Sequence, residues 1–428
     1  MTQRLLLILL FIPLFSISQI SISGTFTPAE NYKWGIVYRI TPTNDRYTTD
    51  TKIDEEGKFS IAMDSTNAPG MYRFVYAVPP EENNFEFIYN GKEDIELTFS
   101  ETEGLTFISS EENIAWGEYQ LEIIPLNYAI AQLYDENPSD SLNIQPLISQ
   151  QKEAQIKFEK SSKNMIAGSF IRASRPYLPT SFESNKIYFQ HKKETYFDSV
   201  DVTDSTLQKS RFLLDQCFYY IENKEDIDTV AAFLKDANKE YQKSILLNIW
   251  QAFVSLEQPE KANYLSRKYL SPLAKELKET SLVNLLFKYE SLSVGAKAPN
   301  FSWKLEDGST QWFHELTGSD HYILVFWSSS CPHCLKELPK LQKKMQTLPK
   351  GKYQVVAFGI EDDIYSWKNE SLRLPNFLHI PGMGKWENDV AKAYDISQTP
   401  TYFILDKDKK IIAKPDELET LVDLLSKE

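Results

Sequence analysis

Cysteine, glycine and basic segments are scarce in this sequence, and each scarcity excludes a class of protein. Three of the 428 residues are cysteine, so no dense disulfide framework holds the chain together and its stability must come from packed cores. With 15 glycines and 21 prolines, the composition is not that of a collagen-like or low-complexity chain. The net charge is −14 at pH 7 and no segment carries a basic stripe, which argues against a nucleic-acid partner.

The sequence also has no apolar run of the roughly 20 residues that a membrane span needs. Its N-terminus instead has the pattern of a secretory signal peptide. Arg4 precedes an apolar run over residues 5–15, and a small-x-small pattern at residues 16–18 fits cleavage before Gln19. We therefore expect residues 1–18 to be removed and the protein to be exported. An uncleaved anchor is the alternative, and it would be the protein's one attachment to a membrane.

The rest of the chain has the composition of a folded, multidomain protein. Apolar residues make up 42% and charged residues 25%, and the length suggests about three domains. Residues 19–110 contain short runs rich in Ile, Val, Phe and Tyr, which predict a β-sandwich, and Asn90-Gly91 predicts a hairpin turn between two of them. Residues 111–292 have the apolar spacing of helices and predict a central α-helical domain.

Residues 293–428 change character and predict an α/β domain. Two nearly continuous apolar runs, 321–327 and 353–360, are typical of buried parallel strands, and a helix is expected to follow the first. An irregular stretch comes after the second run. We then expect a helix over 386–396, a hairpin over 401–414 and a closing helix over 416–427.

Two of the three cysteines lie in one motif, Cys331-Pro332-His333-Cys334, which directly follows an apolar strand and opens a helix. Free backbone N–H groups and the positive dipole end at a helix start favour a thiolate at Cys331. Pro332 suits the first helical turn because it has no N–H to lose, and a protonated His333 would add to the effect. Cys334 lies one turn further in and is placed to resolve a mixed disulfide. The context therefore predicts a redox-active pair.

Other interpretations of the cysteines remain open but have less support. A zinc site needs about four ligands, and neither Cys217 nor the scattered histidines have paired ligand spacing, so we expect no metal and no other cofactor. A purely structural disulfide is the second alternative. Cys217 lies in an apolar helical segment and is expected to be a buried core residue.

The C-terminal region resembles the thioredoxin-like fold, and most closely the TlpA/ResA-like periplasmic thiol-disulfide oxidoreductases. The matching residues are Val294, Gly295, Ala298 and Pro299, then Val325-Phe326-Trp327, then Cys331-x-x-Cys334-x-x-Glu337-x-Pro339, and finally Gln398-Thr399-Pro400 with the run 401–406. The upstream β-rich region also resembles, on pattern alone, domains found before such modules in secreted Bacteroidetes proteins.

The resemblance implies roles for particular residues. Pro400 would be a cis-proline facing the redox pair, and Thr399 would offer its backbone to a bound substrate chain. Glu337 would assist proton transfer at Cys334. Thioredoxin has a buried Asp where this chain has Val325, so Glu337 is the one nearby carboxylate in sequence that could replace that proton acceptor. Pro332, His333 and Trp327 are further candidate substrate contacts, and for Trp327 a place in the core beneath the site is the interpretation we favour.

The resemblance also implies a periplasmic location, substrate proteins with thiols or disulfides, and an upstream redox partner. The Pro-His dipeptide equals that of DsbA, whose couple lies at about −120 mV against about −270 mV for thioredoxin, and therefore favours oxidation. The surrounding family favours reduction, which is our expectation. The alternative function is a partner-binding or assembly protein that uses the thioredoxin-like module as a platform.

Overall fold

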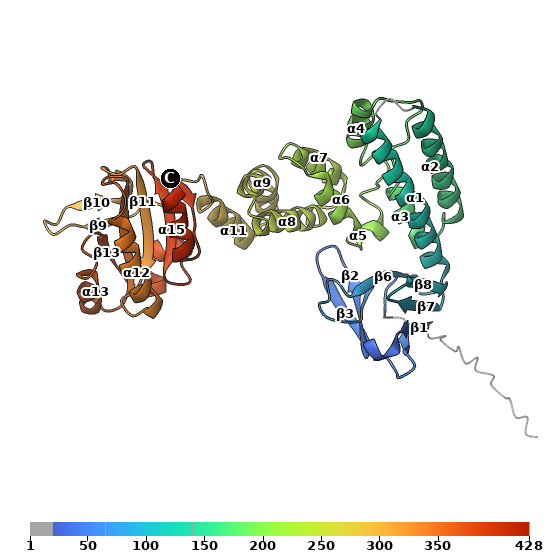
Figure 1. Ribbon diagram of the computed structural model, residues 1–428, viewed down its shortest axis with the longest axis horizontal. Coiled ribbons are helices and arrows are strands. Elements are labelled where there is room, and N and C mark those ends of the chain that lie inside the picture. Colours follow the sequence, from blue (N-terminus) through green and yellow to red (C-terminus); the bar gives the residue numbers. More distant parts are fainter. Residues whose placement is uncertain (1–19, 65, 138–140, 428) are drawn as a thin grey trace, which may run out of the picture. The chain divides into compact units, whose positions relative to one another are not determined.

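The computed structural model describes residues 20–427 except 65 and 138–140, so the predicted signal peptide lies outside the described residues. The chain divides into two compact units, one ending at Ile249 and one beginning at Trp250, and each is considered by itself. Figure 1 shows the order of the elements along the chain. Among the described helices, none combines the length and apolar character needed to span a membrane.

The first unit begins with two four-stranded sheets, as the sequence predicted. One sheet has the order β4-β1-β7-β8 and the other β3-β2-β5-β6. The strands are β1 (Ile20–Thr27), β2 (Trp34–Ile40), β3 (Asp45–Lys52), β4 (Lys58–Met63), β5 (Gly70–Val75), β6 (Asn84–Tyr89), β7 (Ile95–Ser100) and β8 (Gly104–Ser109), with a short 3-10 helix η1 (Ala29–Asn31). Side chains of β4 alternate strictly between exposed and buried, and Phe26 and Phe74 from opposite sheets meet in one aromatic core.

The predicted hairpin at Asn90-Gly91 is wrong, although a turn does form there. The flanking strands β6 and β7 belong to different sheets, so the turn carries the chain from one sheet to the other. Gly91 has a φ of +71°, and the Asn90 side-chain oxygen accepts the Lys92 N–H at 2.9 Å. Local turn chemistry is thus as expected, but burial of both strands in the shared core decides the pairing.

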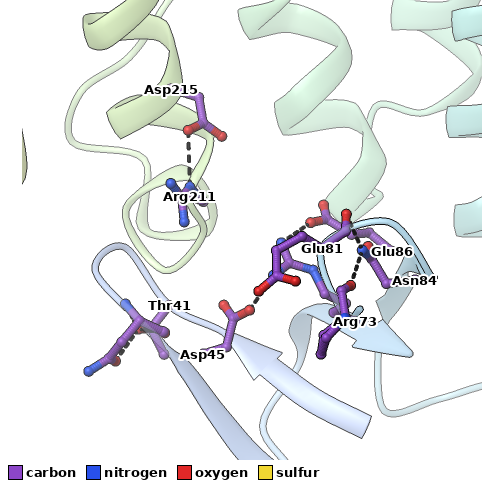
Figure 2. A network of polar contacts seen from close by, with 10 residues as sticks. Thr41, Asp45, Arg73, Glu81, Asn84, Glu86, Arg211 and Asp215 are labelled. Atoms are coloured by element: carbon purple, nitrogen blue, oxygen red, sulfur yellow. Dashed lines mark hydrogen bonds and ion pairs between the residues drawn. The ribbon is translucent and has the colours of Figure 1, made fainter. Parts of the chain in front are cut away.

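The outer face of the second sheet carries ion pairs. Figure 2 shows Arg73 of β5 between Asp45 of β3 and Glu86 of β6, with the Glu86 contact at 2.6 Å. In the helical part of the same unit, Arg211 contacts Asp215 at 3.1 Å, and burial raises the pKa of the Asp215 carboxyl. These contacts pair oppositely charged side chains near the surface, where an ion pair adds little to stability, and they do not indicate a reactive site.

Helices follow, as predicted for the central region. They are α1 (Glu111–Glu136), α2 (Ser141–Ser161), α3 (Ile166–Ala173), α4 (Asn185–Glu194), α5 (Ser205–Gln208), α6 (Phe212–Tyr220), α7 (Asp226–Phe233), η2 (Leu234–Asp236), α8 (Lys239–Ser255), α9 (Pro259–Leu265), the π-helical turn η3 (Ser266–Leu270), α10 (Ser271–Glu276) and α11 (Thr280–Ser291). Ser110 caps α1 by accepting the Asn113 N–H. Cys217 lies in α6 and is fully buried, as expected, and burial raises the pKa of its thiol.

The C-terminal domain contains a five-stranded sheet of order β13-β12-β11-β14-β15. Its larger elements are β11 (His321–Trp327), α12 (Pro332–Met345), β12 (Tyr353–Glu361), α13 (Ile364–Ser371), β13 (Leu378–Met383), α14 (Asp389–Ala393), β14 (Thr401–Asp406), β15 (Ile411–Ala413) and α15 (Leu418–Lys427), and its smaller ones are β9 (Ser302–Lys304), β10 (Thr310–Trp312), η4 (Phe313–Glu315) and η5 (Lys385–Glu387). β11, β12 and β13 are parallel, whereas β14 runs antiparallel to β11.

Alternate residues of these strands build two separate cores. The α12 face of the sheet includes Val325, Trp327 and Tyr402 and packs against α12, α13 and α15. The α14 face includes Phe326 and Phe403 and packs against α14 and residues from the 292–316 segment. The strand period of two therefore lets neighbouring residues of one strand serve different cores.

The stretch expected to be irregular after β12 contains helix α13 and strand β13. β13 lies at the edge of the sheet and includes Pro381 and Gly382, which depress strand propensity. Its partner β12 supplies the pairing that the local sequence does not favour. The helix expected over 386–396 is shorter, since only Asp389–Ala393 is α-helical.

Candidate functional site

The cysteine motif lies where β11 ends and α12 begins. Cys331 is the N-cap residue of α12, and its Sγ accepts the backbone N–H of Cys334 at 3.2 Å. Pro332 occupies the first helical turn without losing a hydrogen bond, and it is exposed, as is His333. The Cys331 side chain is partly exposed. A sulfur in this place receives an N–H donor and the positive end of the helix dipole.

The second cysteine lies directly beneath the first. The Sγ atoms of Cys331 and Cys334 are 2.7 Å apart, both are free thiols, and Cys334 is fully buried. Burial raises the pKa of the Cys334 thiol well above its usual range, and the hydrogen bond to Cys331 raises it further. The pair is therefore asymmetric: one sulfur is within reach of solvent, and the other needs help to lose its proton.

Sheet register brings a distant segment to the motif. Phe326 of β11 lies opposite Thr401 of β14, so the residues just before β14 adjoin the residues just after β11. The Thr399–Pro400 bond is cis, as the resemblance implied. The Thr399 carbonyl accepts a hydrogen bond from Cys331 Sγ at 3.3 Å, across 68 residues of sequence. Thr399, Pro400 and the two cysteines thus form one cluster.

Glu337 lies one helical turn after Cys334, on the same side of α12. Its Oε2 accepts a hydrogen bond from the Tyr402 hydroxyl at 2.9 Å. Tyr402 is 1% exposed and belongs to β14. The carboxylate is therefore held against the sheet, on the helical turn that follows the buried thiol, and Tyr402 is a residue of the site that the sequence analysis did not identify.

Comparison with known proteins also relates this region to thiol-disulfide oxidoreductases. A family model described as the AhpC/TSA family matches residues 294–414. The chain is 26% identical over 128 residues to the thiol-disulfide oxidoreductase ResA of Bacillus subtilis, which covers 29% of this chain and 67% of that protein.

Solved structures add two similar chains. A domain of a possible thiol-disulfide isomerase from Cytophaga hutchinsonii is 33% identical, with a TM-score of 0.28, over 31% of this chain and 91% of that one. A thioredoxin-like protein from Bacteroides caccae is 16% identical, with a TM-score of 0.40, over 59% of this chain and 97% of that one.

Residues 294–414 form a thioredoxin-like domain of the AhpC/TSA family. The domain is of the thiol-disulfide oxidoreductase type.

A second carboxyl group of the thioredoxin-like domain lies near the motif and was not predicted. Glu361 ends β12 and is 2% exposed, and its two oxygens accept the backbone N–H and the hydroxyl of Ser329, the latter at 3.0 Å. Ser329 lies in the turn between β11 and Cys331. An acidic residue at the carboxyl end of a buried parallel strand, beside the strand that leads to the motif, was the signal that would have found it.

The structure corrects one candidate. Trp327 is fully buried and packs in the same core as Cys334, so its ring is part of the support beneath the site and not a surface for substrate. Within the described residues, no three His, Cys, Asp or Glu side chains come together in a way that could hold a metal ion. The groups described at the site are two thiols, the carboxyl groups of Glu337 and Glu361, and the buried phenol of Tyr402.

Proposed function

We propose that this protein is an exported thiol-disulfide oxidoreductase that exchanges its Cys331–Cys334 pair with the disulfides or thiols of substrate proteins. The observation that carries the proposal is the asymmetric pair itself. A partly exposed sulfur caps a helix, a buried sulfur lies 2.7 Å below it, and the carbonyl before a cis-proline lies 3.3 Å from the exposed sulfur. The ResA relatives support this activity class, and the N-terminal segment supports export.

The proposed reaction has two steps. The Cys331 thiolate attacks one sulfur of a substrate disulfide, which forms a mixed disulfide and releases the other substrate sulfur as a thiolate that takes up a proton. Cys334 then gives its proton to Glu337 and attacks Cys331. This forms the Cys331–Cys334 disulfide and releases the second substrate thiol, so two electrons pass from the pair to the substrate. The reverse sequence oxidises a substrate dithiol.

The remaining candidates surround the exposed sulfur. Thr399 and Pro400 would present the backbone of β14's leading segment to a substrate chain, while Pro332 and His333 form the exposed first turn of α12. We propose reduction of substrates as the working direction, which requires an upstream donor of electrons. A measured reduction potential of the pair decides between reduction and oxidation.

Insulin disulfide reduction by the full chain tests the activity, with a dithiol reductant as the electron source. Cys331→Ser should abolish turnover because the attacking sulfur is lost. Cys217→Ser is the matched control: it removes the fully buried thiol of α6 and should leave turnover unchanged. Turnover that survives Cys331→Ser would overturn the proposal.

Trapping separates the enzyme from the alternative of a binding platform. Cys334→Ser leaves the mixed disulfide without its resolving thiol, so substrate proteins should accumulate covalently on Cys331 in cells. A platform would bind its partners without such adducts. Export is tested on the same samples, since mass spectrometry of protein from the periplasmic fraction should find a chain that begins at Gln19.

A further inference from the structure

Tyr402 links the sheet to the acid–base chemistry of the redox pair. Its hydroxyl donates to Glu337 Oε2 at 2.9 Å, and Glu337 lies one turn from Cys334 on α12. We propose that Tyr402 is a positioning residue, which holds the Glu337 carboxylate toward Cys334 for removal of the thiol proton in the resolving step. This inference rests on the proposed function and assigns a role within it.

The direction of this hydrogen bond follows from the surroundings of the phenol. Burial raises the pKa of Tyr402 far above its usual value, and the nearby Glu337, Cys334 and Cys331 raise it further. The hydroxyl therefore keeps its proton and can donate, while an ionised carboxylate can only accept. With Oε2 bound to the phenol, the orientation of the carboxylate is restricted, and Oε1 is the oxygen that we assign to the thiol proton of Cys334.

A second buried tyrosine shows what a purely structural phenol looks like in this domain. Tyr394 is 2% exposed, packs on the α14 face and donates to the backbone carbonyl of Pro299 at 2.6 Å. Both tyrosines are buried, and the hydroxyl of each donates a hydrogen bond. Their partners differ: Tyr394 bonds the backbone of Pro299, whereas Tyr402 bonds the carboxylate of Glu337, one helical turn after the thiol that must ionise. Tyr394 is therefore the matched control.

The step that Tyr402 would assist is the attack of Cys334 on the mixed disulfide. The proton of Cys334 passes to Glu337, the Cys334–Cys331 bond forms, and the bond between Cys331 and the substrate sulfur breaks. The electron pair of that bond leaves with the substrate thiolate. Tyr402 gains and loses nothing in this step. Its removal should slow the step without altering the first attack by Cys331.

Stopped-flow reaction with the aromatic disulfide dithiobis-nitrobenzoate tests this in the full chain carrying Cys217→Ser. The first release of coloured thiolate reports attack by Cys331, and the second reports resolution by Cys334. Tyr402→Phe should slow the second phase on the order of tenfold, a fraction of what general base catalysis contributes, and leave the first unchanged. Tyr394→Phe should change neither. Rate constants are compared only between variants whose circular dichroism spectrum matches that of the parent, so that both phases report folded protein.

Combination with Glu337→Gln separates positioning from a general structural effect. If Tyr402 acts through Glu337, Tyr402→Phe slows the second phase no further once Glu337 is replaced. Three outcomes would overturn the inference and leave the proposed function intact. The first is a second phase in the double variant that is slowed by the product of the two single effects. The others are equal slowing of both phases by Tyr402→Phe and a second phase that Tyr402→Phe leaves unchanged. Absence of a second phase in the Cys217→Ser parent would instead contradict the proposed function.

Discussion

One face of the thioredoxin-like sheet packs against α12, α13 and α15, and the other packs against α14 and residues from the 292–316 segment. Both faces are built by the same strands and both are closely packed. The α14 face is a cluster of apolar and aromatic side chains. The α12 face places Cys334, Tyr402 and Trp327 in one core and has Glu361 buried at its edge.

The difference shows how one strand serves stability and chemistry together. Phe326 of β11 points into the α14 face, and its neighbour Trp327 supports the redox pair on the α12 face. Substitutions on the two faces should therefore have different effects. Those on the α14 face should lower stability alone, whereas those beside the redox pair on the α12 face should also alter its reactivity. Three substitutions probe this contrast.

The largest effect on stability is expected for Phe326→Ala. Phe326 is fully buried and its ring lies 5.0 Å from Tyr394 and 5.5 Å from Phe358. The cavity should lower the free energy of unfolding of the domain by about 3–5 kcal/mol. Urea unfolding followed by tryptophan fluorescence measures this, since five of the eight tryptophans lie in residues 293–428. The insulin reduction rate per folded molecule should stay near that of the parent. A rate that falls together with stability would contradict the idea that the α14 face affects stability alone.

A smaller loss of stability is expected for Glu361→Gln at the edge of the α12 face. The amide keeps the shape of the side chain but offers one acceptor where the carboxyl offers two, so one donor of Ser329 loses its partner. The cost should be about 1–3 kcal/mol, and the reaction of Cys331 with iodoacetamide should change because the preceding turn loosens. Asp362→Asn is the matched control, since that exposed carboxylate pairs with Lys385 at the surface and its loss should cost under about 1 kcal/mol. Equal effects of the two substitutions would contradict a role for Glu361 at the turn.

The parts of this domain that sequence predicts well are those with strong local signals. The apolar run of β11, the helix start at Cys331 and the hairpin of β14 and β15 are each encoded by neighbouring residues, and the structure contains all three. β13 was missed because Pro381 and Gly382 weaken its strand signal, and its pairing with β12 is a tertiary effect.

The site residues divide in the same way. The two cysteines and Glu337 share one motif, and Pro400 belongs to a recognisable run. Tyr402 and Glu361 act on partners 65 and 32 residues away, and only the register of the sheet places them there. Trp327 stayed a candidate for substrate contact because the sequence does not show which face of the sheet is covered at the end of β11.

The smallest expected effect is on how stability depends on pH, and it comes from His379. This residue lies on the α12 face among the rings of Trp327, Trp367 and Phe377. Burial lowers the pKa of His379 below its usual value of 6.5. The unfolded chain therefore binds a proton at a pH where the folded chain does not, so stability is lost as pH falls below about 6.5 and regained as pH rises. Thermal unfolding of the parent between pH 7.5 and 5.5 should show this loss, and His379→Gln, which cannot titrate, should show a shallower one. An equally steep loss in His379→Gln would mean that protonation of this face does not affect folding.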